Sequence, residues 1–316
     1  MPRRSLLPYL VLASGVLIVS TASIMIRLAQ AQGVSSLGIA AGRLGLAALI
    51  LAPIALLRVG GEIRALRRAD LALGLASGAF LALHFASWIS SLEYTSVASS
   101  AALVSTNPLW VGLASLLIFR ERLAWGTLVG IGLTLLGTLL IGLSDSSSSF
   151  SNPLLGNGLA LLGAVSSSAY LLIGRNLRGR LSLLAYIWLV YTTAAVVLLA
   201  CAVLSGQQLL GHSPLAYLLL LGLAIGPQLL GHSSFNWALS SLSATFVAVS
   251  ILGEPIGSAI MALVFFQEGF APLQLLGFAV LLSGILVAAV GEHRAQPTAQ
   301  QEPVIHRRDA ESVEVS

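Results

Sequence analysis

The chain contains no lysine and few charged residues of any kind. Only 9% of its 316 residues are charged, whereas 57% are hydrophobic. Soluble globular domains carry about 25% charged residues, so a fold of this size could not hide so much apolar surface from water. The composition therefore excludes a soluble domain and predicts a protein that is surrounded by lipid.

Cysteine and cofactor-binding patterns are equally scarce. The single cysteine, Cys201, excludes an intramolecular disulfide. The sequence holds no Cys/His cluster with metal-ligand spacing, and no glycine-rich loop that follows a strand and could hold a phosphate. We expect no metal and no other cofactor, which argues against ATP-driven transport by this chain alone.

Long apolar runs fill most of the chain instead. A helix of about 20 apolar residues crosses the hydrocarbon core of a bilayer, so we predict an all-α membrane protein with ten transmembrane helices. The predicted spans cover residues 8–28, 36–57, 70–91, 97–119, 123–143, 154–174, 183–204, 214–238, 244–266 and 272–290. The first span also has the basic start and apolar run of a signal peptide, but its match to a later segment favours a membrane span.

Arginine positions predict the orientation in the membrane. Short loops with an excess of basic residues stay on the cytoplasmic side. All sixteen basic residues are arginine, and the loops after the second, fourth and sixth spans hold most of them. We predict that both termini are cytoplasmic, so the net charge of +4 reflects topology rather than nucleic-acid binding. Residues 291–316 are polar and are expected to form a disordered cytoplasmic tail.

The two halves of the chain repeat each other. Residues 106–143 align without gaps on residues 253–290 at an offset of 147, and segments upstream align at an offset of 148. The matched pairs include Pro108 with Pro255, Glu121 with Glu268, His84 with His232, and Arg27 with Arg175. We predict two five-helix repeats, residues 1–146 and 147–290. An odd number of spans inverts the second copy, as in many secondary transporters, whose substrate site lies near the midplane between the repeats.

The repeated segments resemble the EamA group of the drug/metabolite transporter superfamily. The resemblance is carried by "LHFASWISSLEYTSVASSAALVSTNPLW" (83–110), "RERL" (120–123) and "GEPIGSAIMALVFFQEGFAPLQLLG" (253–277). In each repeat a mid-span proline precedes a glutamate by thirteen residues. The resemblance extends to about residue 290 and implies a ten-helix carrier that exports amino acids, other small metabolites or drugs.

Polar side chains near the middle of the spans form the predicted substrate site, because ionisable groups inside a membrane are functional candidates by default. Glu254 stands directly before Pro255 in an apolar run. We interpret it as a counter-ion for a cationic or amino-bearing substrate or as a proton carrier; the alternative is that it supports a helix kink. The candidate substrate-binding residues are His84, Trp88, Asn107, His232, Asn236, Glu254, Arg43 and Tyr191.

Most of these candidates have a structural alternative. His84 and His232 could bind substrate or relay protons, or they could form interhelical hydrogen bonds. Trp88 could form a stacking wall for a flat or cationic ligand, or it could belong to the aromatic belt at the membrane interface. Arg43 could hold a substrate carboxylate with two hydrogen bonds, or it could pair with Glu93.

Other residues are expected to have structural roles. Tyr191 could line the cavity but could equally serve in packing. Glu121 and Glu268 stand beside short turns, where capping of the following helix is the ordinary role. The glycines of the fifth and tenth spans suit close helix packing, although they leave the oligomeric state open.

These features together predict a secondary transporter that does not use ATP and is not an enzyme. It would export an amino acid, an amine or a drug-like compound by alternating access, coupled to protons or to no ion, in a bacterial inner membrane. Its expected partners are the small-molecule substrate and the lipid bilayer, with no nucleic acid. Two alternatives stay open: an intramembrane hydrolase in which Ser77 works with a histidine, and a passive channel.

Overall fold

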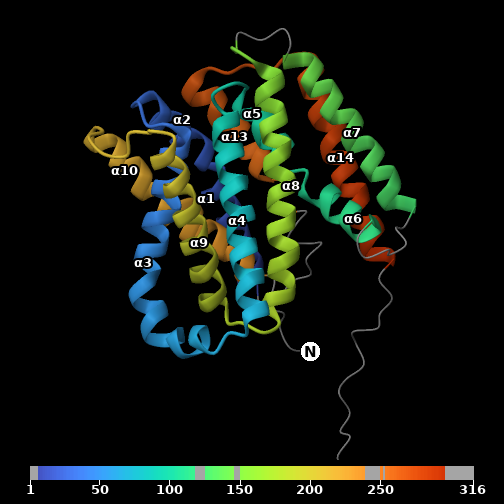
Figure 1. Ribbon diagram of the computed structural model, residues 1–316. Coiled ribbons are helices and arrows are strands. Elements are labelled where there is room, and N and C mark those ends of the chain that lie inside the picture. Colours follow the sequence, from blue (N-terminus) through green and yellow to red (C-terminus); the bar gives the residue numbers. More distant parts are fainter. Residues whose placement is uncertain (1–5, 118–124, 146–149, 239–249, 252, 296–316) are drawn as a thin grey trace, which may run out of the picture.

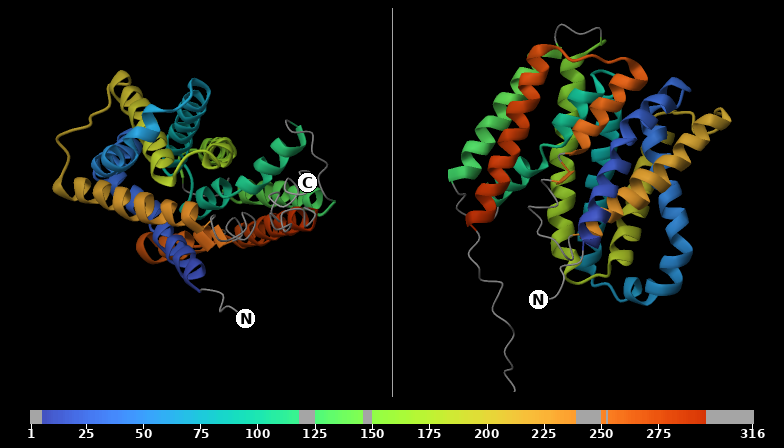
Figure 2. Two further views of the ribbon diagram at one scale, coloured as in Figure 1. Left: turned by 90° about the horizontal axis from the view of Figure 1, so that it is seen from below. Right: turned by 180° about the vertical axis from the view of Figure 1, so that it is seen from behind.

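The protein is an assembly of helices in the computed structural model, which describes residues 6–117, 125–145, 150–238, 250–251 and 253–295 (Figures 1 and 2). The helices are α1 (Leu7–Ser20), α2 (Ala22–Ala31), α3 (Ser36–Arg64), α4 (Arg68–Ser91), α5 (Val97–Val104), α6 (Asn107–Leu117), α7 (Trp125–Asp145), α8 (Pro153–Arg178), α9 (Leu183–Leu204), α10 (Pro214–Leu223), the π-helix η1 (Ala224–His232), α11 (Ser233–Ala238), α13 (Gly253–Phe266) and α14 (Pro272–Ala295). The described residues contain no β-strand.

Six helical stretches are long and apolar enough to cross a membrane. They are Leu7–Ala31, Ser36–Arg64, Arg68–Ser91, Pro153–Arg178, Leu183–Leu204 and Pro214–Phe235. Three shorter apolar helical segments lie within α7, α13 and α14. The chain is therefore an integral membrane protein, and large leucines such as Leu57 and Leu204 face outward, both 87% exposed, as lipid contact requires.

Three of the predicted spans are interrupted rather than continuous. The first breaks at Thr21 between α1 and α2, and the eighth contains the π-helix η1. The fourth breaks between α5 and α6, directly before Pro108. Proline has no N–H to donate to the carbonyl four residues earlier, and its ring crowds that carbonyl. For Pro108 this carbonyl belongs to Val104, the last residue of α5, which accounts for the end of α5. At the C-terminus, α14 continues beyond the predicted end at 290, and the remaining tail lies outside the described residues.

Serine side chains begin several of the helices after tight turns. Ser35, Ser96, Ser182 and Ser213 each accept a hydrogen bond from the backbone N–H three residues later, at 3.1–3.3 Å. Such N-caps satisfy backbone donors that the first helical turn leaves unpaired. The short connections are therefore compatible with a membrane interior that tolerates few free polar groups.

Helices of one sequence repeat pack mainly on helices of the other. α3 packs on α9, α5 on α13 and α7 on α14, which are pairs of equivalent spans. α4 packs on α8, and its equivalent from the second repeat, η1 with α11, packs on α1. α1 begins and α14 ends toward the same side of the bundle (Figures 1 and 2). This reciprocal pairing is the arrangement expected of a two-repeat fold.

The pair α7 and α14 stands at one side of the molecule (Figure 1). A Cβ atom added at Gly137 would lie 2.5 Å from the backbone nitrogen of Leu281, and one at Gly284 would lie 2.6 Å from that of Thr134. No larger side chain fits such a close backbone approach. The glycines of the fifth and tenth predicted spans therefore join these two helices to each other within the chain.

Candidate functional site

Arg43 is the most deeply buried charged side chain described, with no exposed surface. It lies two turns into α3, and its Nε donates a hydrogen bond to Oε1 of Gln228 on η1, at 2.8 Å. The guanidinium carbon lies 4.3 Å from the ring centre of Phe85 and 6.0 Å from that of Trp88, both on α4. Its two terminal nitrogens, Nη1 and Nη2, have no hydrogen-bond partner among the described residues.

The alternative in which Arg43 pairs with Glu93 is wrong. The Glu93 carboxylate instead accepts a hydrogen bond from the hydroxyl of Ser36, in the first turn of α3. Arg43 lies about 10 Å further along the same helix, from the rise of 1.5 Å per residue. Glu93 therefore secures the start of α3, and the charge of Arg43 is left to other groups.

The two histidines flank the aromatic side chains of α4. Nδ1 of His84 donates to the backbone carbonyl of Gly163 at 2.9 Å, since a carbonyl can only accept. The His84 ring stacks on Trp88 with 5.9 Å between ring centres, and His232 meets the edge of Phe85 at the same separation. Trp88 is only 2% exposed, so the interfacial-belt alternative does not describe it.

The π-helix η1 places Gln228 and His232 in this cluster. Pro227 lies inside η1 and cannot donate a backbone hydrogen bond, which disturbs the regular α-helical ladder. π-helical turns are rare and occur frequently at functional sites. The sequence analysis missed Gln228, and the one signal that could have found it was Pro227 in the middle of an apolar run.

Glu254 approaches the cluster from α13. It lies in the first turn of that helix, where the helix dipole favours a negative charge, and is 9% exposed. Its carboxylate is within electrostatic range of Arg43. The hydroxyl of Ser258 donates to the carbonyl of Ser20 at 3.1 Å, which fixes α13 against α1. Residues 239–249 and 252, which include the start of the predicted ninth span at 244, lie outside the described residues.

The other predicted site residues fall in three different places. Tyr191 on α9 is 1% exposed and within electrostatic range of Arg43. Asn107 is the first residue of α6. Its amide nitrogen donates to the carbonyl of Val104 on α5 at 3.1 Å and to that of Ala164 on α8 at 2.9 Å. Asn236 belongs to α11, but its side chain lies outside the described part of the structure.

We call the assembled group the Arg43 cluster. It consists of Arg43, His84, Phe85, Trp88, Tyr191, Gln228, His232 and Glu254. It draws on α3 and α4 from the first sequence repeat, and on α9, η1 and α13 from the second. The arrangement combines one cation, one carboxyl group, two imidazoles and flat aromatic faces, which suits recognition of a small polar molecule.

The hydrolase alternative finds no support in the geometry of Ser77. Its Oγ lies 3.1 Å from the hydroxyl of Tyr186 and 3.4 Å from the carbonyl of Tyr170. A nucleophilic serine needs a base within hydrogen-bond reach, whereas Nδ1 of His84 is engaged with Gly163. Ser77 therefore joins α4 to α8 and α9.

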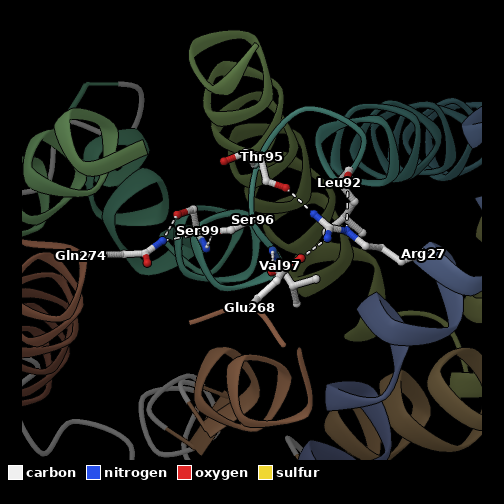
Figure 3. A network of polar contacts seen from close by, with 8 residues as sticks. All are labelled: Arg27, Leu92, Thr95, Ser96, Val97, Ser99, Glu268 and Gln274. Carbon is white, nitrogen blue, oxygen red and sulfur yellow. Dashed lines mark hydrogen bonds and ion pairs between the residues drawn. The ribbon is translucent and has the colours of Figure 1, made fainter. Parts of the chain in front are cut away.

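A second polar group lies at the end of the bundle, around Arg27 (Figure 3). Arg27 forms an ion pair with Glu268, and it donates to the backbone carbonyls of Leu92 and Thr95 at 3.2 and 2.6 Å. Glu268 also accepts from the backbone N–H of Val97, at the start of α5, at 3.1 Å. The expectation that Glu268 caps the following helix is therefore wrong, since it caps a helix of the other repeat. Glu121 lies outside the described residues.

Gln274 extends this network along α14 (Figure 3). Its amide nitrogen donates to the hydroxyls of Ser96 and Ser99 at 3.1 and 2.8 Å. Thr95 adds a hydrogen bond to the side chain of Asn157 at 2.9 Å. The turn between α4 and α5 is thus held by residues of α2, α8 and α14 and by the Glu268 turn.

The side chains at the centre of the Arg43 cluster are buried, with Arg43 at 0%, Tyr191 at 1% and Trp88 at 2% exposure. An apolar hollow of about 200 Å³ lies between α5, α13 and α14, lined by residues that include Pro255 and Phe278. A polar hollow of about 440 Å³ lies at the opposite end of the molecule from α10, around Asp70 and Arg180. Neither of these two hollows is lined by a member of the cluster.

Comparison with known proteins agrees with this picture. The chain matches the EamA-like transporter family over residues 6–143 and 154–290. It is 24% identical to an uncharacterized transporter, YetK, of Bacillus subtilis (strain 168), over 94% of this chain and 97% of that protein. A solved crystal structure superposes with a TM-score of 0.62 over 93% of this chain and all of the other, at 19% identity, which supports the fold alone.

The matched family segments coincide with the two sequence repeats and together cover most of the chain. They include every helix that contributes to the Arg43 cluster and to the Arg27 network. The reciprocal helix packing, the apolar outer surface and the family match therefore lead to one conclusion. This chain is a membrane protein of the EamA-like transporter family.

Proposed function

We propose that the chain is a secondary transporter that exports a small metabolite by alternating access around the Arg43 cluster. The observation that carries the proposal is the cluster itself, a buried polar group assembled from helices of both repeats. Transporters with internal repeats commonly bind their substrate at the repeat interface near the midplane. Movement of one repeat against the other would expose this site to each side in turn.

The wider architecture supports the same proposal. We propose ten spans in two inverted five-helix repeats, residues 1–146 and 147–290, with both termini in the cytoplasm of a bacterial cell and the protein in its inner membrane. The reciprocal pairing of α3 with α9, α5 with α13 and α7 with α14 is what a two-fold relation between the repeats produces. Interrupted helices at the α5–α6 break and at η1 are further features of such transporters.

Glu254 and the two histidines are the proposed titratable groups of the transport cycle. Glu254 is the carboxyl group of the cluster, and its charge interacts with that of Arg43. An intramembrane carboxyl group without a fixed hydrogen-bonded partner is suited to exchange between a proton and a substrate cation. The proposal assigns this exchange to Glu254, with His84 and His232 beside it.

Reconstitution into liposomes tests the function directly. The purified protein would be assayed with labelled amino acids and amines, with and without a proton gradient. A carrier gives saturable flux and counter-exchange, whereas a passive channel gives flux proportional to concentration. Loss of the pH dependence in Glu254→Gln, with residual exchange, supports proton coupling; unchanged flux and pH dependence in this variant removes the role assigned to Glu254.

A further inference from the structure

The Arg43 cluster contains a surplus of hydrogen-bond donors. Nε2 of Gln228 interacts with the hydroxyl of Tyr191 on α9. Three other buried nitrogens have no partner among the described residues: Nη1 and Nη2 of Arg43 and Nε1 of Trp88. Each of these atoms donates and none accepts. Buried polar groups in proteins are nearly always hydrogen-bonded, and an unpaired buried charge is especially costly. A ligand that satisfies this cluster must therefore bring acceptors and negative charge.

The surroundings of Arg43 define how such a ligand approaches. Nε is already occupied by Gln228 at 2.8 Å. The guanidinium carbon lies over the Phe85 ring, 4.3 Å from the ring centre. The end of the guanidinium, with Nη1 and Nη2 side by side, is the part that stays available. Two parallel N–H groups at this spacing match the two oxygens of a carboxylate, which arginine binds with two hydrogen bonds.

The carboxyl group of Glu254 does not supply the acceptors that Nη1 and Nη2 of Arg43 lack. Glu254 lies within electrostatic range of Arg43 but makes no hydrogen bond or ion pair with it. It balances the charge at a distance and leaves the two Nη groups free. The aromatic faces of Phe85 and Trp88 and the ring of His84 complete the cluster beside the guanidinium. Together they provide an apolar wall for the body of a small organic acid.

We propose that the substrate carries a carboxylate group and that Arg43 binds it end-on through Nη1 and Nη2. This inference rests on the proposed function, since it names the chemical class that the transporter carries. Gln228 orients the guanidinium through its bond to Nε. In a zwitterionic substrate the ammonium group would face Glu254, whereas a simple organic acid would use Arg43 alone.

Binding can be measured without transport, on the full-length protein in lipid nanodiscs. The probes are leucine and phenylalanine, their amides, and the acids that lack the amino group, 4-methylpentanoate and 3-phenylpropionate. Ligand-induced shifts of the thermal unfolding midpoint and of tryptophan fluorescence report binding. We expect at least one carboxylate to bind saturably and its amide counterpart to bind at least tenfold more weakly. If the amino acids bind and the acids without an amino group do not, Glu254 binds the ammonium group. If both kinds of probe bind, the affinity comes from the contact between Arg43 and the carboxylate alone.

Variants of Arg43 identify the residue responsible. Arg43→Gln should abolish the difference between acid and amide, and Arg43→Lys should weaken acid binding because a lysine cannot form two parallel hydrogen bonds. Arg58→Gln is the matched control, since Arg58 is exposed on the same helix. Equal binding of acids and amides, retained acid binding in Arg43→Gln, or no binding of any carboxylate would each overturn the inference. Carboxylate binding without any flux would instead refute transport and leave the Arg43 site intact.

Discussion

Arg27 and Arg43 both lie within helices that cross the membrane, yet their surroundings are opposite. Arg27 pairs with Glu268 and donates to two backbone carbonyls. Arg43 is more deeply buried, but its only hydrogen bond is the one to Gln228, and its terminal nitrogens are free among the described residues. A buried charge whose hydrogen-bond and ion-pair partners all lie within the protein stabilises the fold. A buried charge that lacks such partners can obtain them from a bound ligand.

The difference between the arginines also separates two tasks. The Arg27 network ties the turn between α4 and α5 to the turn before α14, and so joins the two repeats at one end of the bundle (Figure 3). The Arg43 cluster joins the repeats through aromatic contacts and two hydrogen bonds, from Arg43 to Gln228 and from His84 to the carbonyl of Gly163. The hydrogen bonds and the ion pair of the Arg27 network must break before the helices can separate at that end. The Arg43 cluster instead retains hydrogen-bond donors that are free to bind a ligand.

The largest effect is expected from removing the paired arginine. Arg27→Met leaves Glu268 without its cation, and breaking a buried ion pair in this way costs about 3 kcal/mol or more. Both side chains are 14% exposed, so we expect the lower end of that range. Thermal or denaturant unfolding in detergent measures the loss. The double variant Arg27→Met with Glu268→Met should recover part of it, and a single variant as stable as the wild type would contradict the comparison.

The next largest effect is expected on ligand affinity. Gln228→Glu places a carboxylate beside Arg43 and supplies internally the acceptor that the substrate would bring. We expect about 100-fold weaker binding of carboxylate probes, which corresponds to about 2.8 kcal/mol, with no loss of stability. Gln208→Glu, the same change at an exposed residue, is the control and should bind normally. Undiminished affinity in Gln228→Glu would place the substrate elsewhere.

A smaller effect is expected within the Arg27 network. Gln274→Leu removes two side-chain hydrogen bonds, to Ser96 and Ser99, and leaves their buried hydroxyls with fewer partners. We expect a loss of about 1–2 kcal/mol of unfolding free energy, without a change in carboxylate affinity in nanodiscs. An affinity change as large as the one in Gln228→Glu would show that the two regions are not separate in function.

The smallest effect on stability is expected from removing the unpaired arginine. Arg43→Met replaces an incompletely paired buried charge with an apolar side chain of similar length, which is often neutral or stabilising. The ligand-free protein should be as stable as the wild type or more stable by about 1 kcal/mol, measured under the conditions used for Arg27→Met. A loss as large as that of Arg27→Met would mean that Arg43 also has a structural role.

The long helices were predictable from the sequence, but their interruptions were not predicted. Apolar runs of the right length predicted the long spans, whereas the break between α5 and α6 was not predicted, although Pro108 beside it could have indicated one. The depth of Arg43 in its span followed from the helical rise. The interruption at Thr21 was not predicted, since "VSTAS" carries no proline or glycine that marks a break.

The partners of the polar residues were harder to predict. Glu93 and Glu268 were both matched with plausible neighbours in the sequence, yet Glu93 binds Ser36 and Glu268 binds Arg27 and the start of α5. Trp88 is a residue type common at membrane interfaces and lies near the end of its span, but it is buried against His84. Gln228 carried no signal of its own, because its role depends on the π-helical turn that brings it to Arg43.

The sequence by itself determined that this chain folds as helices in a membrane, built from two matching halves. Lipid offers no hydrogen bonds to the backbone, so an apolar run of sufficient length has little choice except to form a helix. Only the tertiary structure decided which arginine is paired and which is left free. That outcome depends on how helices from distant parts of the chain are rotated and spaced against one another, and a few ångströms separate a satisfied guanidinium from one that can bind a ligand.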